Sequence, residues 1–147
     1  EKANTDTEKA AVATYEKTMT EAIATRRGSV DQAVTTFRSG VEKVITTHQG
    51  TLDNATETFD VSVTKAFDKA EASCASAVSS NEVRETLRAD LKAARETLRS
   101  TRPDVTETKA ALTTLKSERK ASVDQAVTNF KATAEAARKT LKSAFEQ

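Results

Sequence analysis

Apolar residues in the first half of this chain recur at steps of three, four and four residues, from Val12 to Val78. The positions in this row are Val12, Tyr15, Met19, Ile23, Arg26, Val30, Val34, Phe37, Val41, Ile45, His48, Leu52, Thr56, Phe59, Val63, Phe67, Ala70, Cys74 and Val78. Eleven residues over three turns equal about 3.67 residues per turn, which keeps the row nearly straight along an α-helix. The pattern therefore predicts one long helix beginning near Asn4 or Thr5, which are both capping residue types.

The row loses its phase after Val78, because the next apolar residue, Val83, follows at a step of five. Between them, Ser79 and Glu82 have the spacing of a capping box, in which a hydroxyl and a carboxylate satisfy the first amides of a new helix. We therefore expect the chain to turn here and a second helix to begin.

The second row of apolar residues ends at Pro103, which disfavours helix in the residue before it. Asp104, with Glu107 three residues on, can cap a restart, after which the three-four-four spacing continues to Phe145. These signals predict an all-α fold, a long antiparallel helical hairpin. Its arms are expected at about residues 5–79 and 82–146, with the second arm interrupted near Pro103.

Gly50 is the weak point of the first helix. The segment Thr47 to Thr51 has the composition of a helix end followed by a new cap, and a break at Gly50 would give a four-helix bundle instead. The row keeps its phase across Gly50, which favours the continuous helix.

Residues 26–45 and 119–138 share ten identities in twenty positions, including a heptapeptide that begins at Ser29 and again at Ser122. The two copies are symmetric about residue 82, so folding back there would make facing residue numbers add up to about 164. The expected packing pairs are Val34 with Phe130, Phe37 with Val127, and Val41 with Val123. Arg26 and Arg119 stand in the apolar rows of the two copies, where we expect them to extend their charged ends past the helix contact.

The composition supports a thin helical core. The 147 residues include 24 threonines and 25 alanines but only three glycines and one proline, too few for a fold of strands and tight turns. The net charge is +1, divided between an acidic half (9 basic and 12 acidic residues up to 81) and a basic half (14 and 10). Opposite charges favour pairing the two halves as a single elongated domain over residues 1–147.

Signals of catalysis or metal binding are nearly absent from the sequence. With one histidine and one cysteine, no histidine-based triad or zinc quartet can form, and no glycine-rich phosphate loop occurs. We expect no enzyme activity, cofactor, metal or small-molecule substrate. His48 is expected to form a packed or polar layer, and Cys74 to be a small filler near the turn; an intermolecular disulfide is the alternative for Cys74.

The strongest candidate site is a basic row along one face of the second helix. It consists of Arg84, Arg88, Lys92, Arg95, Arg99 and Arg102. Such a row can contact the phosphates of nucleic acid or of acidic lipids. The alternative is neutralisation by acidic residues of the first arm, namely Asp60, Asp68 and Glu71, and by Glu85 and Glu96 nearby. Tryptophan is absent and the one tyrosine is distant, so stacking on bases is not favoured.

The segment with Arg26, Val30, Val34 and Phe37, repeated from Arg119 to Phe130, resembles Ala/Thr/Arg-rich helical repeats in uncharacterised exported proteins of candidate phyla radiation bacteria. The resemblance implies an exported or cell-surface protein and brings no activity or functional residue with it. We therefore expect a non-enzymatic structural or protein-interaction rod, with a helical protein partner or self-association. The alternative is a module that binds polyanions or acidic membrane surfaces through the basic row.

Overall fold

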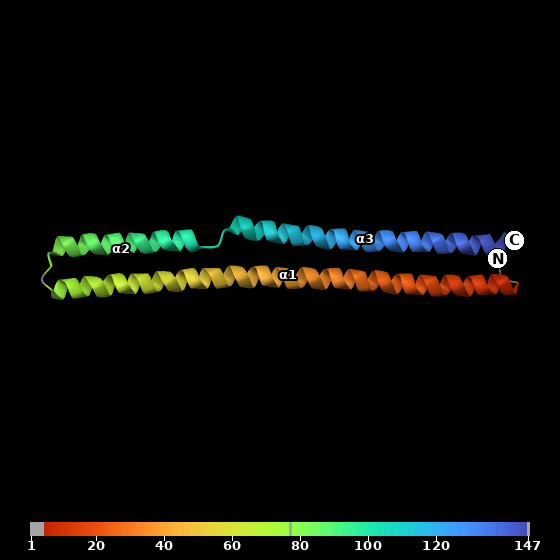
Figure 1. The fold of residues 1–147 in the computed structure, drawn as a ribbon, viewed down its shortest axis with the longest axis horizontal. Helices are drawn as coiled ribbons and strands as arrows, with labels where there is room; N and C mark the ends of the chain where they lie inside the picture. The colour runs from red at the N-terminus through yellow and green to blue at the C-terminus, as the bar shows by residue number, and fades with distance from the viewer. Residues whose placement is uncertain (1–4, 77, 147) are drawn as a thin grey trace. The chain divides into compact units, whose positions relative to one another are not determined.

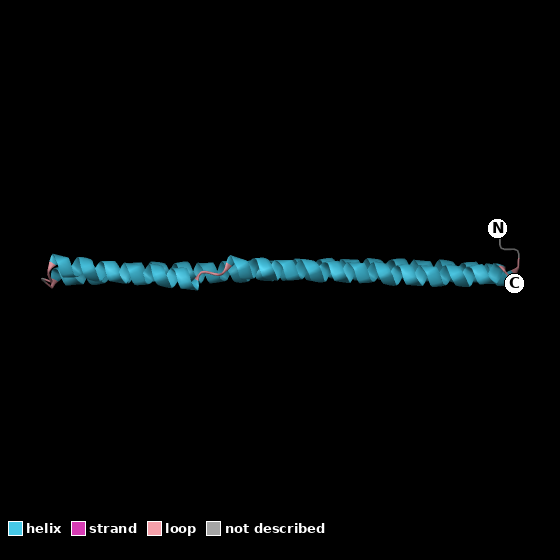
Figure 2. Cartoon of the chain, turned by 90° about the horizontal axis from the view of Figure 1, so that it is seen from above, coloured by secondary structure: helices cyan, strands magenta, loops and turns pink. Residues whose placement is uncertain are grey.

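The computed structural model describes residues 5–76 and 78–146, and within them every regular element is an α-helix. The helices are α1 (Asp6–Ala75), α2 (Ser80–Thr101) and α3 (Val105–Phe145) (Figures 1 and 2). The chain is an all-α helical hairpin, with α1 as one arm and α2 joined to α3 as the other, which confirms the predicted fold class. Gly50 lies inside α1, so the alternative break at that residue is wrong.

Each helix begins at a predicted cap. Before α1, the hydroxyl of Thr5 accepts from the amide of Glu8 at 3.2 Å, and the Glu8 carboxylate accepts from the amide of Thr5 at 2.8 Å. Ser79 accepts from the amide of Glu82 at 3.3 Å at the start of α2. These two pairs confirm the capping signals, because each satisfies amides that have no partner inside the helix.

The turn between α1 and α2 begins earlier than predicted. α1 ends at Ala75, and the carbonyl of Ser73 accepts from the amides of Ser76 at 3.3 Å and Val78 at 3.2 Å. Val78, expected as the last apolar residue of the first helix, therefore lies beyond it. The local hydrogen bonds of the turn replace the helical ones, so apolar spacing alone placed the helix end too late.

Pro103 interrupts the second arm as predicted. α2 ends at Thr101, Arg102 and Pro103 follow without helical structure, and α3 restarts at Val105. Asp104 caps the restart, because its Oδ1 accepts from the amide of Thr106 at 2.7 Å. The lack of an amide hydrogen on proline and its clash with the preceding residue explain why the helix stops here.

The helices pair within two compact units. The first unit contains Glu1–Val41 and Thr113–Gln147, and the second contains Glu42–Leu112. In the first unit α1 packs against α3, and in the second it packs against α2 and the start of α3. None of the helices in the described ranges is both long enough and apolar enough to span a membrane.

The register between the arms differs from the predicted one. Arg26 contacts Phe130, and Phe37 contacts Arg119, so facing residue numbers add up to 156 in the first unit. In the second unit, Lys69 and Asp90 face each other, and their numbers add up to 159. The predicted value of about 164, and with it the pairing of Phe37 with Val127, is wrong because the turn comes before residue 80. The pairings of Val34 with Phe130 and of Val41 with Val123 are wrong for the same reason. The interruption at residues 102–104 accounts for the further difference in the first unit, because non-helical residues cover more length than helical ones.

Candidate interaction surface

Small side chains form the contact between the helices. The buried residues of the described chain are Ala33, Ala55, Ala66, Val83, Ala94, Ala126 and Ala134. Gly40 lies at the same contact, where a Cβ atom would come within 2.6 Å of Leu115 Cδ2. Alanine and glycine allow close approach of two helices, although each buries little apolar surface. The contact is therefore narrow, as the composition indicated.

The larger apolar side chains lie beside this contact and not at its centre. The six expected packing residues, Val34, Phe37, Val41, Val123, Val127 and Phe130, are all half-buried. In the second unit, three residues of the predicted row are still more open: Ile45 is 46% exposed, Leu52 is 38% exposed and Phe67 is 53% exposed. We call these three residues the apolar flank.

Two arginines of the duplicated segments stack on phenylalanine rings across the first unit. Arg26 Cζ lies 4.7 Å from the centroid of Phe130, and Arg119 Cζ lies 4.5 Å from that of Phe37. Arg26 is half-buried and Arg119 is exposed. A guanidinium over a ring face is attracted by the π electrons, which explains how a charged residue occupies the apolar row.

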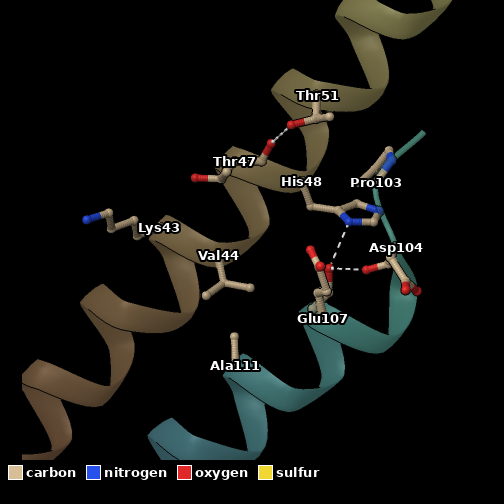
Figure 3. Close-up of a pocket in the computed structure, with 10 residues that line it drawn as sticks. Lys43, Val44, Thr47, His48, Thr51, Pro103, Asp104, Glu107 and Ala111 are labelled. Atoms are coloured by element: carbon tan, nitrogen blue, oxygen red, sulfur yellow. Dashed lines mark hydrogen bonds between the residues drawn. The ribbon is translucent and has the colours of Figure 1, made fainter. Parts of the chain in front are cut away.

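His48 borders a hollow of about 370 Å³ between α1 and the start of α3, inside the second unit (Figure 3). Its Nδ1 is 3.0 Å from Thr108 Oγ1, and the Thr108 hydroxyl donates to the carbonyl of Asp104 at 3.3 Å. The half-buried imidazole is thus a polar link between helices, one of the two arrangements expected for it.

The other polar groups around this hollow serve the helix backbone. Thr51 donates to the carbonyl of Thr47 at 3.0 Å. The amide of Thr106 lowers the pKa of Asp104 below its ordinary value of 3.8, because that hydrogen bond favours the ionised carboxyl group. Among the described residues, no cluster of three or more His, Cys, Asp or Glu side chains could hold a metal ion.

All six residues of the predicted basic row are exposed: Arg84, Arg88, Lys92, Arg95 and Arg99 on α2, and Arg102 directly after its end. The expected neutralising residues Asp60, Asp68 and Glu71 form no ion pair with them in the ranges that the structure covers. Lys92 pairs at 3.8 Å with Glu96, one of the two acidic residues expected to neutralise the row from its own helix. The ion pair that does join α1 to α2 is Lys69 with Asp90, at 2.8 Å.

Cys74 is exposed, so the expectation of a small filler inside the helix contact is wrong. It falls in the same helical row as Leu52 and Phe67, on the side of α1 where the larger apolar residues lie.

Sequence reasoning treated the whole apolar row as the internal contact and therefore missed the apolar flank. The available signal was the second row of Ala33, Gly40, Ala55 and Ala66, which runs parallel to the apolar row. A narrow contact through those small residues leaves the larger ones at its side. Comparison of the chain with protein-family models, with curated proteins and with solved structures found no match.

Proposed function

We propose that this chain is a non-enzymatic structural or protein-interaction module whose helices associate with another helical surface. The exposure of Ile45, Leu52 and Phe67 on one side of α1 is the observation that carries the proposal. Aligned apolar side chains in water favour association with apolar surface elsewhere, and exposed groups of this kind often mark interaction sites.

Recurrence of contacts along α1 supports coiled-coil packing with an 11-residue period as part of this proposal. Arg26, Phe37 and His48 are 11 residues apart, and each contacts a side chain of α3 within its own unit. Export to the cell surface is also proposed, on the resemblance of the duplicated segments alone.

Photo-cross-linking in the cells that make the protein tests the interaction. A benzophenone side chain replaces Leu52 in one variant and Val61 in a control variant. Val61 is 47% exposed but lies about 160° around α1 from Ile45. We expect protein adducts, identified by mass spectrometry, from position 52 and few from position 61. Equal labelling from both positions, or adducts to lipid or nucleic acid from position 52, would refute the proposal.

Binding of a polyanion by the basic row is the second candidate function. It is supported by the exposure of Arg84, Arg88, Arg95, Arg99 and Arg102, which have no ion-pair partner within residues 5–76 and 78–146. Phosphate binding through these residues would weaken steeply with salt, because bound counterions are released. Titration of duplex DNA and of anionic vesicles, with Arg88, Arg95 and Arg99 replaced by Ala as comparison, tests it. Affinity that ignores salt or survives the triple substitution would exclude this function.

A further inference from the structure

The apolar flank occupies a definite side of α1 within residues 42–112. Successive residues of an α-helix are about 100° apart, so Ile45, Leu52 and Phe67 fall within roughly 60° of one another. α2 is level with α1 from residue 58 to the end of α1, because level residues have numbers adding up to about 159. The buried Ala66, 3% exposed, therefore marks the direction of α2, and Phe67 lies about 100° around α1 from it, in the sense of increasing residue number. Ile45 and Leu52 continue this side of α1 beside the start of α3.

α2 has a matching row of half-buried leucines, Leu87, Leu91 and Leu98. They lie about 50° around α2 from the buried Val83 and Ala94, again in the sense of increasing residue number. Because the two helices are antiparallel, rotation in the same sense brings both rows to the same face of the pair. Beside α2, this face of the second unit is formed by Phe67 of α1 and the leucine row of α2.

The opposite face of the same pair is polar and lined by small side chains. The ion pair of Lys69 with Asp90 lies there, beside a hollow lined also by Ser62, Ala93 and Thr97. None of the apolar flank or of the leucine row lines that hollow. The pair of helices thus has one apolar face and one polar face, as a pair of helices inside a larger bundle does.

Charges of opposite sign border the apolar face. Beyond the apolar flank, α1 has an exposed acidic row made of Asp53, Glu57, Asp60, Asp68 and Glu71. Beyond the leucines, α2 has the basic row. By helical spacing, Lys65 and Lys69 of α1 and Asp90 and Glu96 of α2 lie away from this face, whereas Lys43 lies about 20° from Asp68 and Glu85 about 20° from Lys92. Across the face, the order is acidic, apolar, apolar, basic.

We propose that a second copy of this chain covers this face, related by a two-fold axis parallel to the helices, so that each α1 lies over the α2 of the other copy. This proposal rests on the proposed function and names its partner. In this arrangement the acidic row of each copy meets the basic row of the other. A two-fold axis across the helices would instead bring like charges together, which disfavours it.

The register of the hairpin puts these opposite charges at equal levels. Residues of α1 and α2 that are level have numbers adding up to about 159, as Lys69 and Asp90 show. Copies at the same level would therefore pair Glu71 with Arg88 and Asp60 with Arg99. Glu57 with Arg102 completes the series. The acidic border also argues against a phosphate-rich lipid or nucleic-acid surface as the occupant, because it would repel phosphate.

The first experiment measures the molar mass of the full chain by sedimentation equilibrium over a wide concentration range. We expect twice the monomer mass of 15.9 kDa, with Phe67→Gln and Leu52→Gln together weakening the dimer by about tenfold or more. Val61→Gln is the matched control, because Val61 has similar exposure on the other side of α1. A monomer at every concentration, or equal weakening by the control, would overturn the proposal.

The second experiment uses charge reversal. One variant carries Asp60→Arg and Glu71→Arg, and the other carries Arg88→Glu and Arg99→Glu. Each variant alone is expected to dimerise about tenfold more weakly or worse, whereas an equimolar mixture forms heterodimers, because the exchanged charges complement each other only between chains. Circular dichroism of each variant checks that its helices are retained. Absence of heterodimers in a mixture of folded variants would contradict the pairing.

Orientation is tested with Cys74, which is exposed and unique in the chain. The proposed axis places the two Cys74 residues at the same level, so a short bis-maleimide should link two chains of the wild type but not of Cys74→Ala. A dimer that is not linked would overturn the parallel axis. If the chain is a monomer while a benzophenone at position 52 still labels a different protein in cells, the proposed dimer is wrong. The proposed function as a protein-interaction module is then retained.

Discussion

Substitution of the glycines in α1 distinguishes a close helix contact from open helix surface. Gly28 and Gly50 have nothing within 4 Å of an added Cβ, whereas at Gly40 the atom would lie 2.6 Å from Leu115 Cδ2 and 3.1 Å from Cδ1. Alanine is favoured over glycine inside a helix by about 1 kcal/mol. Overpacking a well-filled contact costs about 1 to 3 kcal/mol. The methyl groups of the half-buried Leu115 are the end of a side chain that can turn aside, so only part of that cost applies. We therefore expect Gly28→Ala to stabilise the protein by about 1 kcal/mol and Gly40→Ala to stabilise it clearly less.

Thermal and urea unfolding followed by circular dichroism measure both variants. A change of 1 kcal/mol corresponds to roughly 3 °C in Tm for a chain of this size. In a Leu115→Val background the clashing methyl groups are gone, so Gly40→Ala should regain most of the helix preference, giving a favourable coupling in a double-mutant cycle. If Gly40→Ala stabilises the wild type as much as Gly28→Ala does, the close contact at Leu115 is not present.

Three further predictions concern contacts described above. Exchange of Arg119 for Met and of Phe37 for Leu should show a coupling of about 0.5 to 1 kcal/mol in a double-mutant cycle of unfolding free energies, and zero coupling would exclude the stacking. The folded state holds the pKa of the Asp104 carboxyl group below 3.8. The ionised carboxylate therefore stabilises the folded protein above that pH, and this stabilisation is lost as the pH falls further. Between about pH 5 and pH 2, the free energy of unfolding measured in urea should therefore fall less for Asp104→Asn than for the wild type. The same pH dependence in both proteins would contradict the cap. Ser79→Ala should lower the stability by about 1 kcal/mol through loss of the cap on α2, measured in the same way; no change would mean that Ser79 does not hold that helix end.

The helix starts and the interruption at Pro103 were the most predictable part of this fold. The cap at Ser79, the restart at Asp104 and the interruption at Pro103 depend on neighbours within four residues, so the sequence contains their whole cause. The continuity of α1 through Gly50 was also predictable, because a single glycine costs a helix only about 1 kcal/mol and the apolar spacing persists on both sides.

The register between the helices, and the side of α1 that meets its partner helix, were harder to predict from the sequence. The duplication suggested symmetry about residue 82, but the turn at Ser76 to Ser79 shifted every facing pair, and no local signal measures that shift. Periodicity shows which side of a helix is apolar without showing which side meets its partner. Here the contact runs through Ala55 and Ala66, and Phe67 lies beside it. The stacking of Arg26 on Phe130 depends on this register and could not be derived without it.

The reciprocal stacking of Arg26 on Phe130 and of Arg119 on Phe37 bears on the origin of the internal duplication. Each arginine and each phenylalanine is the counterpart of the other across the duplication, since 93 residues separate 26 from 119 and 37 from 130. The two contacts therefore exchange places about a local two-fold axis through residues 31–32 and 124–125. A single ancestral helix carrying one arginine and one phenylalanine at this spacing would already form both contacts with an antiparallel copy of itself. Gene duplication and fusion would have turned an association between two molecules into an intramolecular one, and the two copies would afterwards have been free to diverge in charge.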